Sequence, residues 1–429
     1  MNQIDKDILR IALPSAVSNV TIPLLGLIDT AITGHLGAAY YIGAIAVGAS
    51  IFSLCYWLFS FLRMGTAGIT AQATGREAWD ECRECLRKAL TIAIGGGAAI
   101  IALQGVIAAG ALILIDATEE VERWARVYFL ILVWGAPANL GLSALNGWFI
   151  GMQNAKAPMT IAIGQNVLNI LASCLLVFTF GIGVRGVAYG TLIAQWSGFA
   201  AACIWAKQLL DHVPQASVTQ SNQALTWNRF FHVNRDIFLR TLCLIAVMFS
   251  FTAFGARIGE TPLAVNALLM QLFLFVSYLM DSYAYAAEAL GGKMLGAKDR
   301  EAFRFLIRRL FLWGSITSAL FCLVFATGHE GIIALLTDNT EVRELARQFI
   351  WVAILIPAVS LGAFIYDGIF IGTTSTREML VSIAIATAAY YAIALLTTSN
   401  TGLWCAFLTY LGTRGAIQHL QMRSILKKI

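Results

Sequence analysis

Residues 146–151 read Asn-Gly-Trp-Phe-Ile-Gly, and residues 367–372 read Asp-Gly-Ile-Phe-Ile-Gly. The two stretches are 221 residues apart, and the same shift aligns Glu120-Val121 with Glu341-Val342. Over residues 120–151, ten of 32 aligned pairs are identical without a gap. Apolar segments can resemble each other through composition alone, but a constant shift across separate segments favours a duplication. We therefore predict two halves of similar structure.

The composition predicts that both halves lie in a membrane. Hydrophobic residues make up 59% of the 429 residues and charged residues only 12%, whereas soluble proteins have about 45–50% and about 25%. Twelve apolar runs are long enough to cross a bilayer as helices. They lie near residues 9–33, 41–70, 86–115, 125–150, 159–180, 185–209, 236–257, 262–290, 305–327, 346–371, 378–398 and 401–422. The expected fold is an all-α membrane protein with six spans in each half.

The distribution of basic residues predicts the orientation. With twelve spans, 22 of the 29 lysines and arginines lie on the side of the N-terminus and 6 on the opposite side. Because cytoplasmic loops are rich in basic residues, we expect both termini in the cytoplasm. The predicted organisation is an N-terminal lobe over residues 1–210, a polar cytoplasmic linker over 211–235 and a C-terminal lobe over 236–429.

The number of spans in each half suggests a function. Six is an even number, so the two copies are inserted with the same orientation. Secondary transporters built from such parallel repeats bind substrate between the halves and expose it alternately to the two sides. This pattern is the first indication that the chain transports a solute.

Asp29 is the most informative polar residue within a predicted span. It lies in Leu-Leu-Gly-Leu-Ile-Asp-Thr-Ala at residues 24–31, where inserting a carboxylate costs about 2.5–3.5 kcal/mol. A carboxyl group in an apolar setting holds its proton more tightly, so a proton and a cationic solute can compete for it. The alternative is an aspartate that only bonds a neighbouring helix. Pro14 and Pro23 in the same span favour a bend, which is either static or part of the transport cycle.

Other polar residues are candidates for a substrate cavity. Asn169 and Ser173 share one face of the fifth span, and Tyr128, Asn146 and Thr191 lie in the adjacent fourth and sixth spans. Individually, such residues are more often hydrogen-bonding contacts between helices. In the second half, Asp367 occupies the position of Asn146 in the repeat, and Asp281 and Glu288 lie within the eighth span.

The sequence predicts neither a metal site nor a cofactor. Cys82 and Cys85 form a single C-x-x-C motif without the second pair of ligands that zinc requires. Gly95-Gly96-Gly97 lacks the following Lys-Ser/Thr of a phosphate-binding loop. Active transport would therefore draw on an ion gradient or on another chain. The net charge of +5 does not by itself suggest a nucleic-acid partner.

Several motifs together resemble the multidrug and toxic compound extrusion (MATE) family, in its DinF branch. They are Pro-Leu-Leu-Gly-Leu-Ile-Asp-Thr-Ala at 23–31, Gly-His-Leu-Gly at 34–37, Phe-Leu-Arg-Met-Gly-Thr-Ala-Gly at 61–68, Gly-Ala-Pro-Ala at 135–138, Gly-Ala-Arg-Ile-Gly at 255–259 and Asp-Gly-Ile-Phe-Ile-Gly at 367–372. The similarity extends from about residue 8 to about residue 425.

The resemblance implies a monomeric twelve-helix antiporter in a bacterial inner membrane. It implies export of cationic amphiphilic compounds across the lipid bilayer in exchange for protons or sodium ions. It implies that Asp29 is the coupling site, that Tyr128, Asn146, Asn169 and Thr191 line the N-lobe cavity, and that Pro14 is the helix-bend proline. Ser173 occupies a position where the family often has an aspartate. The loss of that carboxylate favours coupling to protons. Asp367 matches a second-lobe acid of the family and is a second candidate for ion coupling.

Three other functions fit parts of the sequence. A flippase for lipid-linked glycans should have a strongly cationic cavity, for which Arg63 is the one candidate. An intramembrane enzyme should have a nucleophile and a base at one depth, and no His or Cys is adjacent to Asp29 in the sequence. A passive channel would transport solute without an ion gradient.

Overall fold

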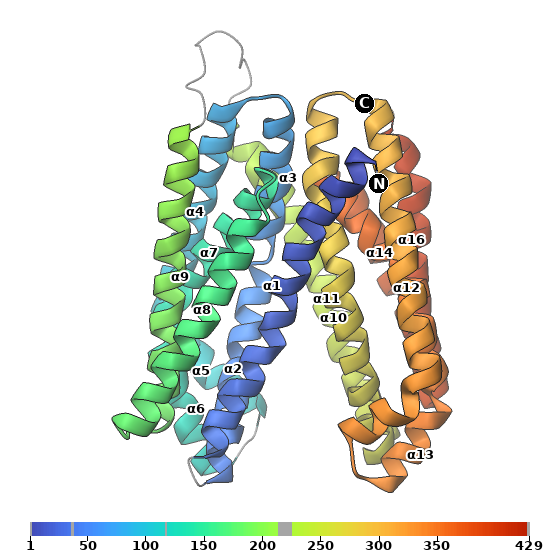
Figure 1. Cartoon of the computed structure of the whole chain (residues 1–429). Helices are drawn as coiled ribbons and strands as arrows, with labels where there is room; N and C mark the ends of the chain where they lie inside the picture. The colour runs from blue at the N-terminus through green and yellow to red at the C-terminus, as the bar shows by residue number, and fades with distance from the viewer. Residues whose placement is uncertain (1, 36–37, 116–117, 213–224, 427–429) are drawn as a thin grey trace. The chain divides into compact units, whose positions relative to one another are not determined.

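The computed structural model describes residues 2–35, 38–115, 118–212 and 225–426, and all regular elements in these ranges are helical (Figure 1). By their internal contacts these residues form two units. The N-terminal unit contains Val17–Phe231, and the C-terminal unit contains Met1–Ala16 together with His232–Ile429. The predicted lobes differ from these units at their edges, because the first residues of the chain, Met1–Ala16, pack with the C-terminal unit. Part of the predicted linker, residues 213–224, lies outside the described residues.

The helices follow the chain in a regular order. α1 (Gln3–Gly34) begins in the C-terminal unit and continues in the N-terminal unit, whereas α10 (Trp227–Ile258) begins in the N-terminal unit and continues in the other. The remaining helices of the N-terminal unit are α2 (Ala39–Leu58), α3 (Phe61–Gly75), α4 (Trp79–Ala102), α5 (Gln104–Ile115), α6 (Glu119–Leu132), α7 (Ala136–Gly151), α8 (Lys156–Cys174) and α9 (Val184–His212). Those of the C-terminal unit are α11 (Glu260–Gly296), α12 (Arg300–Leu336), α13 (Thr340–Gln348), α14 (Ile350–Gly372), α15 (Thr376–Ala394) and α16 (Asn400–Ile425).

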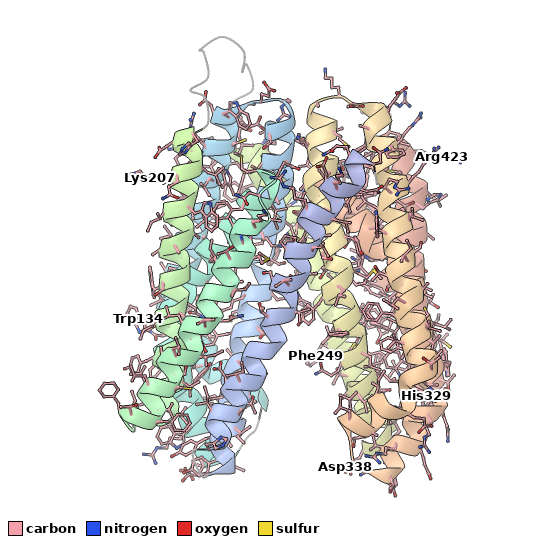
Figure 2. The ribbon with its side chains drawn as sticks, viewed as in Figure 1. Trp134, Lys207, Phe249, His329, Asp338 and Arg423 are labelled. Atoms are coloured by element: carbon pink, nitrogen blue, oxygen red, sulfur yellow. The ribbon has the colours of Figure 1, made fainter. Side chains whose placement is uncertain are left out.

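Helices occupy all twelve predicted spans, although several spans consist of two helices. Within the described residues, ten helical stretches are long and apolar enough to cross a membrane. The two predicted spans outside this set lie in α1 and α16. Many large apolar side chains face outward, including Phe249, which is 76% exposed. In the C-terminal unit, Figure 2 shows Arg423 at one end and His329 and Asp338 at the other, as expected for a chain whose middle lies in lipid.

The predicted internal repeat is confirmed by the helix boundaries. α2 and α3 together run from Ala39 to Gly75, and α11 runs from Glu260 to Gly296, 221 residues later at both ends. The same shift relates the starts of α4 and α12, the starts of α6 and α13, and the ends of α7 and α14. The four described non-glycine residues with positive φ also form two pairs at this shift, Glu77 with Lys298 and Gln153 with Thr374.

A close helix crossing recurs in both copies. Gly147 on α7 lies against the carbonyl oxygen of Arg63 on α3, so a Cβ atom there would be 2.1 Å from that oxygen. Gly368 on α14 lies in the same way against the carbonyl oxygen of Ala284 on α11, at 2.2 Å. Only glycine permits this separation of the two backbones. Close packing of the two backbones therefore explains why both hexapeptides have a glycine at the position of Gly147 and Gly368.

Each unit has its own apolar core. In the C-terminal unit, Phe251 of α10 packs against Trp404 and Phe407 of α16, with ring centroids 4.7 and 5.3 Å apart. In the N-terminal unit, Trp148 of α7 is fully buried and its indole nitrogen donates to the carbonyl oxygen of Cys82 at 3.0 Å. These cores hold the helices that carry the polar groups described next.

Candidate functional site

Asp29 lies on α1 within the N-terminal unit, and its residue surface is 8% exposed. Its carboxylate oxygen Oδ1 is buried and has no hydrogen-bond partner among the described residues. Thr33, one turn later, donates to the backbone carbonyl of Asp29 at 2.5 Å and not to the carboxylate. A buried acceptor without a donor is unusual in proteins. The carboxylate is therefore available to a proton, an ion, water or a solute.

Polar side chains from three other helices are connected to Asp29 through Tyr128. Tyr128 of α6 is close enough to interact electrostatically with Asp29, and its side chain also forms a hydrogen bond with Thr191 of α9. Asn169 of α8 donates its Nδ2 to the Thr191 hydroxyl at 2.9 Å. That hydroxyl in turn donates to the carbonyl of Val187 at 3.0 Å. We call Asp29, Tyr128, Asn169 and Thr191 the N-unit polar cluster.

The acceptors of this cluster are only partly satisfied. The Oδ1 atom of Asn169 is buried without a partner among the described residues, and so is the hydroxyl of Ser173, one turn further along α8. Ser173 faces α9 at Gly190, the residue before Thr191. Asn146 on α7 also has a buried Oδ1 without a described partner, but no hydrogen bond links it to the cluster. The structure thus brings together the four residues of the N-unit polar cluster and places Ser173 one turn from Asn169, whereas Asn146 is not joined to them.

The two prolines of the first span lie within one helix. α1 is helical from Gln3 to Gly34 and passes through both Pro14 and Pro23. Pro14 lies two residues before the end of the segment that packs in the C-terminal unit. The side chain of Pro23 lies outside the described residues. A bend of α1 that changes during transport remains a prediction.

Asp367 has a different environment from Asp29. Its Oδ2 accepts hydrogen bonds from Arg240 of α10 and Arg414 of α16, and Gln418 donates to its Oδ1 at 2.6 Å. Two buried guanidinium groups already neutralise the charge of this carboxylate. This arrangement fits a structural ion cluster and does not fit the coupling role predicted from the sequence. Asp281 of α11 lies close enough to interact electrostatically with Arg414.

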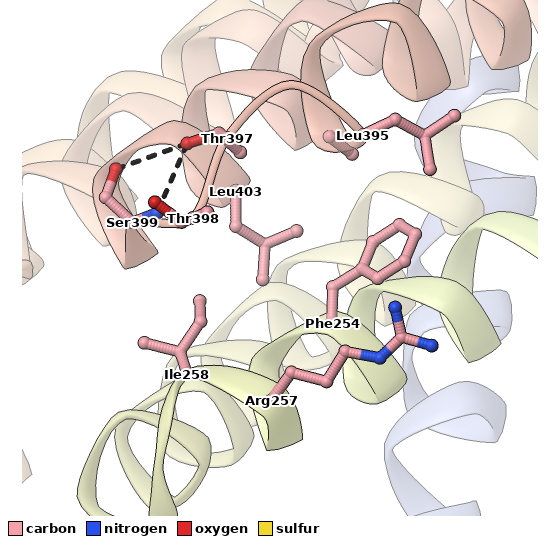
Figure 3. Close-up of a pocket in the computed structure, with 9 residues that line it drawn as sticks. Phe254, Arg257, Ile258, Leu395, Thr397, Thr398, Ser399 and Leu403 are labelled. Atoms are coloured by element: carbon pink, nitrogen blue, oxygen red, sulfur yellow. Dashed lines mark hydrogen bonds between the residues drawn. The ribbon is translucent and has the colours of Figure 1, made fainter.

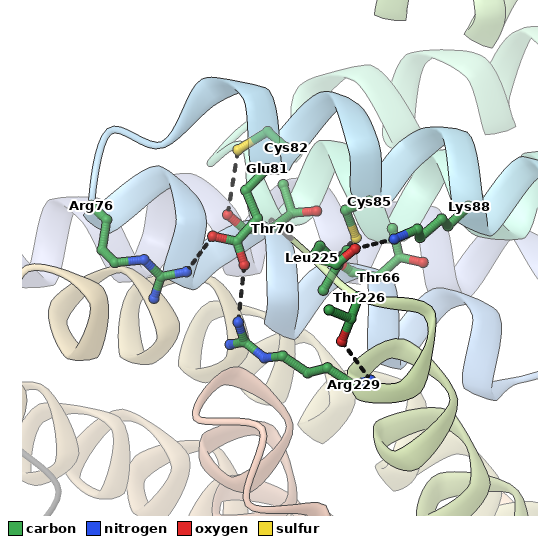
Figure 4. Close-up of polar contacts among 10 residues, drawn as sticks. All are labelled: Thr66, Thr70, Arg76, Glu81, Cys82, Cys85, Lys88, Leu225, Thr226 and Arg229. Atoms are coloured by element: carbon green, nitrogen blue, oxygen red, sulfur yellow. Dashed lines mark hydrogen bonds and ion pairs between the residues drawn. The ribbon is translucent and has the colours of Figure 1, made fainter. Parts of the chain in front are cut away.

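A second charged cluster in the N-terminal unit was not predicted as a site from the sequence. Glu81 on α4 pairs with Arg76 at 2.7 Å and with Arg229 of α10 at 3.2 Å, as Figure 4 shows. Lys88, one heptad later, is 3% exposed and donates to the carbonyl of Leu225. In the sequence, Glu81 and Lys88 lie one heptad apart with two cysteines between them at helical spacing. This spacing was the signal that one face of α4 is buried.

The two cysteines of the C-x-x-C motif contribute to helix packing. The Cys82 thiol donates to the carbonyl of Thr70 at 3.9 Å, and the Cys85 thiol donates to the carbonyl of Thr66 at 3.8 Å. Both acceptors lie on α3 (Figure 4). No group of three or more potential metal-ligating side chains was found in the residues that the structure describes.

A pocket of about 260 Å³ lies at the end of α10, in the C-terminal unit. Its walls include Phe254 and Arg257 of α10 and the segment from Leu395 to Ser399, as Figure 3 shows. The residues that line it include no carboxylate. It therefore lacks the group that a proton-coupled site requires.

Comparison with known proteins identifies the relatives of the chain. The sequence pattern of the MatE family matches twice, over residues 14–175 and 237–396. The DNA damage-inducible protein F of Escherichia coli is 37% identical over 415 residues, which cover 96% of this chain and 90% of that protein. The probable multidrug resistance protein NorM of Acinetobacter baylyi is 25% identical and covers 83% of this chain and 81% of its own length.

Solved structures share the fold. The Vibrio cholerae MATE transporter VcmN in its bent form superposes with a TM-score of 0.87 at 20% identity, covering 99% of this chain and 97% of that chain. The sequence matches to the family pattern lie one in each half, as the duplication predicts.

Proposed function

Because the chain belongs to the MatE family, whose members are membrane transporters and not enzymes, we propose that it is a secondary antiporter that exports small organic cations in exchange for protons. The observation that carries this proposal is the Asp29 carboxylate, which is buried with one oxygen unpartnered. Tyr128 is close enough to interact with it electrostatically. An intramembrane acid without a fixed counter-ion is a functional group by default.

The coupling follows from competition at one carboxylate. When Asp29 is ionised, its charge attracts a cationic solute, and the polar groups of Tyr128, Asn169 and Thr191 supply hydrogen-bonding partners. When Asp29 is protonated, the charge disappears and the solute is released. The two states must differ in their affinity for the solute, because a ligand shifts a conformational equilibrium only through such a difference. Aromatic side chains add cation–π attraction.

We favour protons over sodium ions as the coupling ions. A sodium site needs several oxygen ligands, usually with more than one carboxylate, and Ser173 occupies the position one turn from Asn169 where the family often has an aspartate. Among the described residues of the N-terminal unit the buried carboxylates are Asp29 and Glu81, and Glu81 is already paired with two arginines. A proton needs only one carboxylate.

We propose that the transporter works as a monomer in a bacterial inner membrane with both termini in the cytoplasm. The moving parts would be the lobes at residues 1–210 and 236–429, joined by the linker at 211–235. In the C-terminal unit the first turns of α1 and Arg423, near the end of α16, lie at the same end of the helices (Figures 1 and 2), which an even number of membrane crossings requires.

The test is efflux of a fluorescent organic cation from proteoliposomes under imposed gradients. Wild-type protein should export the cation with a pH gradient and not with a sodium gradient alone. Asp29→Asn should abolish gradient-driven export, whereas Asp338→Asn, which removes an exposed carboxylate, should leave it unchanged. Normal export by Asp29→Asn would refute the mechanism. Export driven only by sodium would refute the ion assignment, and movement of lipid-linked glycan without cation export would favour the flippase.

A further inference from the structure

A groove of about 420 Å³ lies beside the start of α12, within the C-terminal unit. It is lined by Ile4, Glu301, Ala302, Arg304, Phe305 and Arg308. Ile4 comes from the first turns of α1, in the segment that packs in this unit, and the other residues come from the first turns of α12. The residues that line the groove are not members of the N-unit polar cluster.

The groove has an excess of positive charge. Arg300, Arg304 and Arg308 are spaced four residues apart, so they form one stripe along α12. All three are exposed, and no ion pair with a carboxylate is found for them in the described ranges. Arg309, on the adjacent face, is already engaged by Asp5 at 2.6 Å. Arg304 and Arg308 are therefore available to an external anion.

The first half of the chain provides an internal comparison. Arg83 and Arg87 of α4 occupy the repeat positions of Arg304 and Arg308. Arg83 pairs with Asp80 at 2.9 Å, and Arg87 pairs with Glu84 at 2.8 Å. In the second half, Glu301 corresponds to Asp80, but Phe305 occupies the position of Glu84. Both copies thus have the two arginines, but the second copy has an aromatic ring at the position of a neutralising acid in the first.

The position of the groove suggests the chemistry of its ligand. The predicted ninth span begins at residue 305, so the arginines lie at the boundary between water and lipid. Guanidinium groups bind phosphate oxygens in a bidentate manner, and Ile4 and Phe305 provide apolar surface for an acyl chain. A free phosphate ion would gain nothing from that apolar surface.

We propose that this groove binds the phosphate headgroup of an anionic phospholipid, held by Arg304 and Arg308, with its chains against Ile4 and Phe305. The proposal depends on the chain crossing the membrane and does not depend on proton coupling. Its failure would therefore leave the transport mechanism untouched.

The test measures phosphatidylglycerol retained by the detergent-purified full chain, using native mass spectrometry with phosphatidylcholine as the neutral reference. Arg304→Gln with Arg308→Gln should reduce phosphatidylglycerol retention by at least about fivefold, the size expected for losing one or more arginines near a charged membrane surface. The matched variant Arg83→Gln with Arg87→Gln should leave retention near the wild-type level, because those arginines are already paired within their own helix. Equal losses in the two variants would overturn the proposal.

A second variant tests the groove without removing an arginine. Phe305→Glu places an acid three residues before Arg308, as Glu84 precedes Arg87, and should lower phosphatidylglycerol retention. Phe305→Leu, which keeps the position apolar and uncharged, should retain at least half of the wild-type level. Unchanged retention in Phe305→Glu would contradict the proposal. Saturable binding of soluble glycerol 3-phosphate at the same concentrations would assign the site to free phosphate compounds and overturn the lipid assignment.

Discussion

Alanine at the two helix-crossing glycines is the sharpest test of how the halves are packed. In Gly147→Ala the new methyl group would lie 2.1 Å from the carbonyl oxygen of Arg63, and in Gly368→Ala it would lie 2.2 Å from that of Ala284. Side-chain carbons essentially never approach a heavy atom within 3.0 Å. Both opposing atoms are backbone atoms, so no side chain can rotate away. The helices must separate by roughly 1 Å, the gap between these distances.

The expected cost follows from two opposing effects. Overpacking a well-packed core costs about 1–3 kcal/mol, whereas replacing glycine by alanine inside a helix returns about 0.5–1 kcal/mol. Subtracting the helix gain leaves a range of about 0–2.5 kcal/mol, and we expect Gly147→Ala and Gly368→Ala in the upper half of it because both opposing atoms are backbone atoms. Gly95→Ala and Gly164→Ala are the matched controls, because both positions are helical and exposed with nothing within 4 Å of the added carbon. They should be neutral or stabilising.

The assay is thermal unfolding of the purified protein in detergent, followed by intrinsic tryptophan fluorescence. Gly147→Ala and Gly368→Ala should unfold below the wild type and below both controls. Because the two crossings lie in separately packed units, the losses in a double variant should add. If either crossing variant unfolds at or above the temperature of its controls, the argument from backbone contact is wrong.

Three further predictions address the charged and polar groups. Asp367→Asn removes the buried carboxylate that Arg240 and Arg414 share and should cost about 3–5 kcal/mol of stability, measured by thermal unfolding. Asp338→Asn, which loses only an exposed ion pair, should leave the unfolding temperature almost unchanged. The Arg309 guanidinium holds the pKa of Asp5 below its ordinary value of 3.8, so this contact stabilises the start of α1 above that pH and is lost as the pH falls below it. The protection of residues 3–16 against hydrogen exchange, corrected for the intrinsic exchange rate, should therefore fall between about pH 7 and about pH 3. Asp5→Asn should remove this pH dependence. Protection that does not change with pH in the wild type would contradict the prediction. Tyr128→Phe removes the hydroxyl that forms a hydrogen bond with Thr191. It should reduce cation export and lower the free energy of unfolding by about 1 kcal/mol. Full export at equal protein levels would show that transport does not need this hydroxyl.

Much of the fold follows from one-dimensional patterns. Apolar run length predicts helices because a bilayer leaves backbone groups no partner except their own helix. The repeat at Gly147 and Gly368 was visible as paired hexapeptides, and the helix ends at Gly151 and Gly372 repeat at the same shift. The membrane class and the duplicated plan were thus determined by sequence alone, because each depends on local composition and spacing.

The roles of individual charged residues depend on tertiary structure. Asp29 and Asp367 look alike in the sequence, as single acids in apolar spans. Asp29 keeps an unpartnered oxygen, whereas Arg240 and Arg414, distant in sequence, surround Asp367. No spacing rule predicts that pairing, because it depends on which helix faces meet. The sequence determined which charges enter the apolar spans, and only the packing of helices decided which of them are neutralised, since an ion pair requires two groups to meet in space.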